Sequence, residues 1–156
     1  MRFYSLFILL LLGGLILTTV RRSSLPRGIR NNNPGNIRLT DIQWQGMQEA
    51  QNDPAFVQFI DPVYGFRAMT RILRNYQRRG LVTLRDMIST YAPKSENDTN
   101  AYVNFVANRL NVSPDTALDL ALHLFPLLKA ISEFENGSRF ANHYDNTTIQ
   151  EGIALA

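Results

Sequence analysis

The sequence contains no cysteine and only two histidines, His123 and His143, among its 156 residues. Without cysteine the protein cannot build a disulfide scaffold, a cysteine-bound zinc site or a thiol nucleophile. His123 lies within an apolar helical pattern and His143 in an asparagine-rich loop, and neither has a carboxylate at metal-ligand spacing. No serine stands in the context of a nucleophile elbow. We therefore predict no metal and no cofactor, and we look for catalytic groups among the carboxylates.

Charge of either sign is also sparse. Charged residues make up 19% of the chain, and 16 Lys plus Arg stand against 13 Asp plus Glu, a net charge of +3. The arginines between residues 71 and 85 follow a helical pattern without a glycine-rich or zinc motif for nucleic acid. A solvated helix face that also favours an anionic cell surface explains them. We therefore expect no nucleic-acid partner, and the sequence does not indicate an oligomeric state.

Long apolar runs are confined to the N-terminus, where residues 3–20 carry no charge. A helix of this length reaches roughly 27 Å, just enough for the core of a bilayer. The sequence therefore predicts a transmembrane helix and divides into an anchor or signal-anchor over residues 1–22 and one domain over residues 23–156. A cleaved signal peptide is the alternative, although no A-x-A-like site follows the run, and a buried core helix is a third. Arginines on both sides of the run leave its orientation open.

The rest of the chain is predicted to be mainly α, with six short helices and one small β-hairpin. Asp61 and Pro62 cap and begin a helix that Gly80 ends, and Thr83 caps the next one. The other helices are expected after Asp98 and Thr99 as far as Leu110, from Ser113 to the residue before Pro126, over residues 127–136, which Pro126 opens, and from Thr148. Residues 43–60 are β-prone on both sides of a turn at residues 52–54, which predicts the hairpin.

Two glutamates near the end of the expected 127–136 helix differ in their surroundings. Glu133 follows Lys129 by four residues, which predicts a solvated ion pair. Glu135 instead continues the apolar stripe of Leu128 and Ile131, one turn before the helix ends. Burial raises the pKa of a carboxyl group, and a carboxylic acid that stays protonated near neutral pH can act as a general acid. Glu135 is therefore the candidate acid, unless it only caps a neighbouring backbone or pairs with an arginine.

The string GIRNNNPGNIR, residues 28–38, is the most specific motif in the chain. Its asparagine amides on a Pro-Gly turn suit sugar hydroxyls and acetamides, or equally hold the loop itself. The string resembles the lysozyme-like peptidoglycan-cleaving proteins of phages and prophages, described as lytic transglycosylase-like endolysins or virion proteins. The resemblance covers residues 27–155 and continues through Trp44 and Gly46, DPVYGFRA (61–68), YAPKSENDT (91–99), AYVNFVANRLNV (101–112) and ENG (135–137). It implies a lysozyme-like catalytic domain after residue 22.

A second likeness concerns AISEFENG, residues 130–137. This string is similar to the helix end of bacterial glucosaminidases and soluble lytic transglycosylases, where a catalytic Glu precedes a small or polar residue and Gly. Glucosaminidases place an asparagine turn and a W-x-G after that helix, whereas residues 33–38 and 44–46 precede it here. The transfer of roles requires something like a circular permutation. It implies that Glu135 protonates the oxygen between N-acetylmuramic acid and N-acetylglucosamine.

The resemblance also implies a substrate cleft, with Trp44 stacking on a sugar face unless it is a core tryptophan. The residues expected to line this cleft are Asn33, Asn36, Arg38 and Trp44. Lytic transglycosylases need one catalytic Glu, because the 6-hydroxyl of the sugar closes a 1,6-anhydro ring. A hydrolytic muramidase with Glu96 or Asp53 as the second carboxylate stays open. Glu96 is also the alternative acid, or else a first-turn residue of the next helix.

The predicted function is therefore cleavage of peptidoglycan glycan strands by a protein of phage or prophage origin. The predicted location is the inner membrane, through residues 3–20, with the catalytic domain facing the periplasm. A non-catalytic virion or wall-binding protein with the same fold is the alternative, and a membrane-tethered interaction domain is a third possibility.

Overall fold

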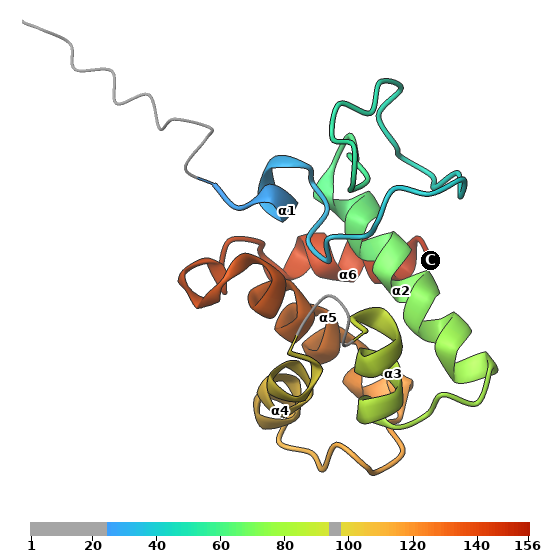
Figure 1. Ribbon diagram of the computed structural model, residues 1–156, viewed down its shortest axis with the longest axis vertical. Coiled ribbons are helices and arrows are strands. Elements are labelled where there is room, and N and C mark those ends of the chain that lie inside the picture. Colours follow the sequence, from blue (N-terminus) through green and yellow to red (C-terminus); the bar gives the residue numbers. More distant parts are fainter. Residues whose placement is uncertain (1–24, 94–97) are drawn as a thin grey trace, which may run out of the picture.

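The computed structural model describes residues 25–93 and 98–156 (Figure 1). This part of the chain is mainly helical, as the sequence predicts. Its elements are α1 (Arg27–Arg30), α2 (Pro62–Arg78), α3 (Leu84–Tyr91), α4 (Thr99–Leu110), α5 (Leu120–Asn136), the 3-10 helix η2 (Ser138–Phe140) and α6 (Asn146–Ala154).

Capping side chains begin the helices where the sequence places them for α2, α3 and α4. The carboxylate of Asp61 accepts from the Val63 backbone N–H at 2.8 Å, and Pro62 is the first helical residue. Thr83 and Asp86 form a reciprocal capping box at the start of α3. Asp98 caps α4 by accepting from the backbone of the third helical residue. These three predicted helix starts are confirmed.

The core lies around α5, which runs between α6 on one side and α3 and α4 on the other (Figure 1). Helix α2 packs closely along α6, where Gly152 lies against Phe66: a Cβ on this glycine would come within 2.5 Å of the Phe66 Cβ. The largest fully buried side chains are Phe59, Phe66, Met69, Leu73, Leu84, Met87, Ile88, Tyr102, Leu127, Leu128, Ile131 and Ile149. Burial of these apolar groups is the main source of the stability of the fold.

The predicted break at Pro126 is wrong, because this proline lies inside α5. Proline removes one hydrogen bond, here the one that would reach the carbonyl of Leu122. Leu122 is 74% exposed, so water can replace the missing donor, while Leu124, Leu127 and Leu128 anchor the opposite face of the helix in the core. The last helix also differs, since Asp145 rather than Thr148 is its cap, and its first helical residue is Asn146.

The predicted β-hairpin over residues 43–60 is also wrong. Among the described residues this segment forms only isolated antiparallel bridges, Arg38 with Phe56 and Met47 with Phe59. The side chain of Gln51 contributes to this, because its amide oxygen accepts from the Gln58 N–H at 2.7 Å, whereas the Gln58 carbonyl keeps a backbone donor in Gln48. A side-chain oxygen thus takes the N–H that pairing with a second strand would use.

The fold class predicted from the sequence therefore needs correction. It is a helical domain without a hairpin, and no helix in residues 25–93 and 98–156 is long and apolar enough to cross a membrane. The expected membrane segment, residues 3–20, and the alternative acid Glu96 both lie outside the described residues.

Candidate functional site

The candidate site forms where the loop after α1 meets the C-terminal end of α5. The side-chain amide of Asn136, the last residue of α5, donates at 2.9 Å to the carbonyl of Pro34 and at the same distance to the carbonyl of Ser132. This buried amide fastens the Pro-Gly turn of the asparagine-rich string to the end of the helix. Two segments about a hundred residues apart in the sequence therefore share one surface (Figure 1).

Glu135 is held at this junction by two side chains. Its Oε2 accepts from the amide of Asn36 at 2.9 Å, and its Oε1 accepts from the hydroxyl of Tyr102 at 2.9 Å. Asn36 has a φ of +47°, a left-handed conformation that asparagine tolerates better than most residues. Tyr102, on α4, is fully buried and stacks on Phe134, with ring centroids 3.8 Å apart. Both carboxylate oxygens of Glu135 are thus oriented by donors from other elements.

Burial of the Glu135 carboxyl raises its pKa above the ordinary glutamate range, although the hydrogen bonds from Asn36 and Tyr102 act in the opposite direction. Burial and the nearby Glu135 charge also raise the pKa of Tyr102 and of Tyr91 well above the usual tyrosine value. Tyr102 therefore keeps its proton and remains a donor at neutral pH. The arrangement provides a partly buried carboxylic acid that can deliver a proton.

Close packing fixes the loop that carries Asn36. The hydroxyl of Tyr91 donates to the Gly35 carbonyl at 2.6 Å. A Cβ on Gly35 would lie 2.2 Å from that hydroxyl, so no larger residue fits there. Gly28 is enclosed in the same way, because a Cβ there would lie 2.5 Å from Asn136 Oδ1 and 2.9 Å from Asn36 Oδ1. The two glycines let the loop approach α3 and α5 closely enough for Asn36 to reach Glu135.

A cleft of about 800 Å³ begins at Asn36 and Tyr91 and runs between residues 36–45 and α2. This volume is in the range of sites that hold small molecules or short polymers. The lining residues are Asn36, Ile37, Arg38, Thr40, Ile42, Gln43, Trp44, Gln45, Arg67, Arg71, Ile72, Asn75, Tyr76, Arg78 and Tyr91. Glu135 is not among the lining residues, but Asn36 lines the cleft and also binds Glu135, so the candidate acid lies one side chain away from the cleft.

Three of the four residues expected to line a cleft do so: Asn36, Arg38 and Trp44. Trp44 is half-buried and also packs on the edge of the core. Asn33 is different, because it is fully buried, its amide donates to the carbonyls of Ile37 and Val57, and its oxygen accepts from the Ile37 N–H. Asn33 therefore holds the loop together and does not face the cleft.

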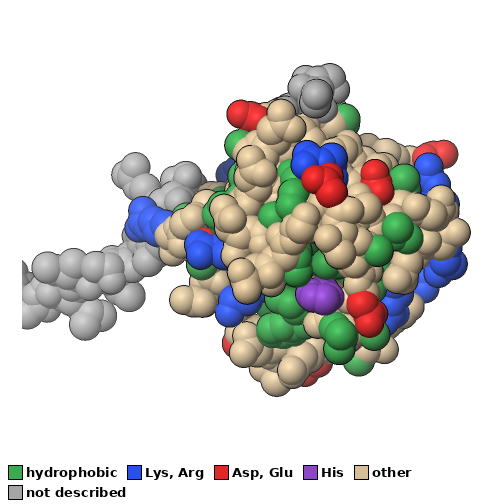
Figure 2. All heavy atoms as spheres, turned by 90° about the horizontal axis from the view of Figure 1, so that it is seen from below, with side chains coloured by type: hydrophobic (Ala, Val, Ile, Leu, Met, Phe, Trp, Pro, Cys, Tyr) green, Lys and Arg blue, Asp and Glu red, His purple; other side chains and the backbone are tan. Residues whose placement is uncertain are grey.

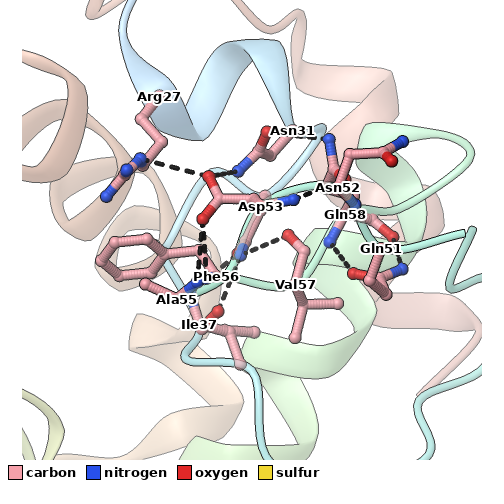
Figure 3. Close-up of polar contacts among 11 residues, drawn as sticks. Arg27, Asn31, Ile37, Gln51, Asn52, Asp53, Ala55, Phe56, Val57 and Gln58 are labelled. Carbon is pink, nitrogen blue, oxygen red and sulfur yellow. Dashed lines mark hydrogen bonds and ion pairs between the residues drawn. The ribbon is translucent and has the colours of Figure 1, made fainter.

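Asp53, the possible second carboxylate, is committed to a structural network (Figure 3). It accepts from the Asn31 amide at 2.8 Å and from the backbone N–H groups of Ala55 and Phe56, and it forms an ion pair with Arg27 at 3.1 Å. Burial raises the pKa of Asp53, but these donors together bring it below its usual range. Its side chain is 10% exposed. The charged carboxylate of Asp53 therefore holds the loop of residues 48–58 against α1.

The predicted environment of Glu133 is wrong. Glu133 is only 6% exposed, and its carboxylate pairs with the guanidinium of Arg109 on α4 rather than with Lys129. Sequence reasoning did not single out Tyr102 as a site residue. The signal was present, because a buried tyrosine hydroxyl needs a hydrogen-bond partner. No group of three His, Asp or Glu in the described part of the chain could hold a metal ion.

Fold and site together define a small helical domain with an oriented, partly buried glutamate beside a cleft. No family model matches the chain. It is 40% identical over 132 residues to Protein P5 of Pseudoalteromonas phage PM2, a match that covers 81% of this chain and 79% of that protein. The chain belongs to the family of this phage protein. A phage relative agrees with the phage or prophage origin expected from the sequence, and its name states no activity.

Proposed function

We propose that this protein cleaves the glycan strands of peptidoglycan between N-acetylmuramic acid and N-acetylglucosamine, with Glu135 as the general acid. The single observation that carries the proposal is the Glu135 carboxyl, which is partly buried, has a raised pKa and is oriented by Asn36 and Tyr102. Cleavage of a glycosidic bond needs a proton on the leaving oxygen as the bond breaks. The resemblance of residues 27–155 to phage peptidoglycan-cleaving proteins supports the same reaction.

Among the described residues, the carboxylates near the site favour one reaction type. Hydrolysis by the usual pair of carboxylates requires a second group a few ångströms from the acid. Asp53, one of the two candidates, already binds four donors and stabilises a loop. We therefore favour the lytic transglycosylase reaction, in which the same Glu accepts a proton from the sugar 6-hydroxyl as the anhydro ring closes. The substrate lies outside the cytoplasmic membrane, so the proposed site of action is the periplasm.

Purified peptidoglycan provides the test. The wild-type protein is expected to release soluble fragments that carry 1,6-anhydro ends, identified by mass spectrometry. Glu135→Gln keeps the size of the side chain but cannot deliver a proton, and it should lower the rate at least about a hundredfold. Reducing ends instead of anhydro ends would assign a hydrolytic muramidase and direct attention to Glu96. Binding to the wall without any cleavage by the wild-type protein would contradict the proposal and indicate a wall-binding virion protein.

A further inference from the structure

The cleft beside Glu135 is strongly one-sided in charge. Four arginines line it, namely Arg38, Arg67, Arg71 and Arg78, and the lining contains no Asp or Glu among the described residues. The chain as a whole has nearly balanced charges, with 16 basic and 13 acidic residues. The lining of the cleft is therefore more basic than the chain on average. A basic cleft attracts anionic ligands and raises their local concentration.

Three of these arginines come from one face of α2. Arg67, Arg71 and Arg78 lie four and seven residues apart, which places them on one side of the helix. Figure 2 shows Lys and Arg side chains along the right-hand edge of the molecule, the side on which α2 lies in Figure 1. The segment of residues 36–45 carries Trp44, and α2 also carries Tyr76 into the lining. Aromatic rings and guanidinium groups therefore line the same cleft.

Two of the arginines are positioned by the end of the chain. The Nε of Arg67 donates to the Leu155 carbonyl at 3.0 Å, and Nη1 of Arg71 donates to the main-chain oxygen of Ala156 at 3.0 Å. A guanidinium group carries five N–H donors, so each of these residues keeps further donors for a ligand. Anchored guanidinium groups lose less side-chain entropy when they bind a carboxylate, which they can do through two parallel hydrogen bonds.

We propose that the α2 face of the cleft binds the carboxylates of peptidoglycan stem peptides, so that the preferred substrate is a glycan strand that still carries its peptides. This inference rests on the proposed function, because it identifies the substrate class of the same cleft. Stem peptides carry free carboxylates on D-glutamate, on diaminopimelate and at the terminal D-alanine. A glycan strand whose sugars reach Glu135 would extend these peptides along the arginine face.

Trp44 allows a direct test, since it is the only tryptophan in the chain and it lines the cleft. A synthetic tetrapeptide, L-Ala-D-Glu-diaminopimelate-D-Ala, is titrated into the full chain while the Trp44 fluorescence is recorded. A saturable change is expected with the free carboxylates and none with the fully amidated tetrapeptide. The affinity should fall at higher ionic strength, because exposed charges are screened.

The matched variants are two pairs on α2. Arg71→Gln combined with Arg78→Gln should weaken tetrapeptide binding about three- to thirtyfold, the range expected for two solvent-exposed ion pairs. Arg74→Gln combined with Arg79→Gln removes the same charge away from the cleft lining and should leave binding unchanged. Thermal unfolding of both variants checks that they fold. In the Glu135→Gln background, which cannot cleave, the first pair should lower binding to intact sacculi more than binding to sacculi stripped of peptides by an amidase.

Equal affinity for the free and amidated tetrapeptides would overturn the inference, as would equal losses in the two paired variants. Tighter binding of a single-stranded oligonucleotide through Arg71 and Arg78 would also overturn it and would assign the cleft to nucleic acid. Failure of the proposed function appears in a different measurement, the absence of glycan cleavage by the wild-type protein. Cleavage without tetrapeptide binding contradicts only the inference. Tetrapeptide binding without cleavage contradicts the proposed function and leaves the α2 face of the cleft as a binding site for stem-peptide carboxylates with no role in catalysis.

Discussion

The amide of Asn36 donates to the carboxylate of Glu135 at 2.9 Å across 99 residues of sequence. Neither residue could hold this position alone. Asn36 depends on a left-handed backbone and on the glycines that let its loop approach α5, while Glu135 depends on the last turn of a helix anchored in the core. The contact links the most specific string of the sequence with its best acid candidate.

Substitution of Glu133 should lower the stability of the protein, whereas substitution of Glu135 should lower its activity. Glu133→Gln weakens the ion pair between the buried Glu133 carboxylate and the half-exposed Arg109, and it should lower the free energy of unfolding by about 1–3 kcal/mol, the cost of disturbing a hydrogen bond to a charged group. Its rate on peptidoglycan should stay near that of the wild type at temperatures where it is folded. Glu135→Gln should show the reverse pattern. Urea unfolding and dye release from labelled sacculi measure the two properties, and equal loss of activity in both variants would contradict the assignment of Glu135.

The pH dependence of activity should report the raised pKa of Glu135. A general acid works only while protonated, so the rate should fall on the alkaline side as the pH passes the pKa of the folded state. Tyr102→Phe removes a hydrogen bond that stabilises the charged form, so this alkaline limb should move to higher pH by up to about one unit. Phenylalanine keeps the ring that stacks on Phe134. A limb that moves to lower pH would show that Tyr102 does not act through Glu135.

The same shift has a consequence for stability. Because the folded-state pKa of Glu135 is raised, the folded protein holds this proton more tightly than the unfolded chain does. The contribution of Glu135 to the stability should therefore be greatest below the ordinary glutamate pKa and should decrease as the pH rises through the folded value. Glu135→Gln has no proton to lose, so the difference in unfolding free energy between the two proteins should change across that window. A constant difference between pH 3 and pH 8 would contradict the raised pKa.

Two substitutions of Asn36 should distinguish its backbone role from its side-chain role. Asn36→Gly keeps the positive φ and removes the amide, whereas Asn36→Ala also strains the backbone. Both variants should lose activity because Glu135 loses a donor that orients it. The alanine variant should be less stable than the glycine variant by about 1 kcal/mol, the order of cost of a left-handed conformation for a residue with a Cβ. Thermal unfolding and glycan release measure the two effects, and a fully active glycine variant would remove Asn36 from the site.

Asn33→Ala should be a stability variant rather than a binding variant. It leaves the carbonyl of Val57 and the N–H of Ile37 buried without their partner, while the Ile37 carbonyl keeps the Val57 N–H. Each buried unpaired group costs about 1–3 kcal/mol, so the total loss should reach at least about 2 kcal/mol. The exposed Asn52 provides the control, and Asn52→Ala should change the unfolding free energy by less than about 0.5 kcal/mol. A stable Asn33→Ala variant with weakened binding to the cell wall would contradict this interpretation and show that Asn33 contacts the substrate in the cleft.

The sequence correctly predicted the features that depend only on residues close together in the chain, such as helix starts. Asp61 with Pro62, Thr83 with Asp86, and Asp98 begin helices because each satisfies free N–H groups within three residues. The apolar stripe also predicted correctly that Glu135 is partly buried. These features need no information from distant parts of the chain.

The failures concern features that distant residues decide. Pro126 stays inside a helix because the core holds both of its flanks, and the Gln51 side chain takes the Gln58 N–H that strand pairing would use. Glu133 points to Arg109 on another helix, which no i to i+4 rule can foresee. Asn33 and Asn36 are the same residue type three positions apart, and only the folded loop shows that the first is internal and the second contacts the acid.

Two hydrogen bonds between distant parts of the chain have a consequence for synthesis of the protein. They join Asn36 to Glu135 and Asn136 to Pro34. A nascent chain emerges from the ribosome N-terminal end first, and a domain completes its packing only when the last contributing segment is free. The amides of the asparagine string are made about a hundred residues before the carboxylate that they orient. An incomplete chain that stops before residue 135 therefore holds the loop but has no oriented acid, so any activity that this site supports begins only after nearly the whole domain has been translated.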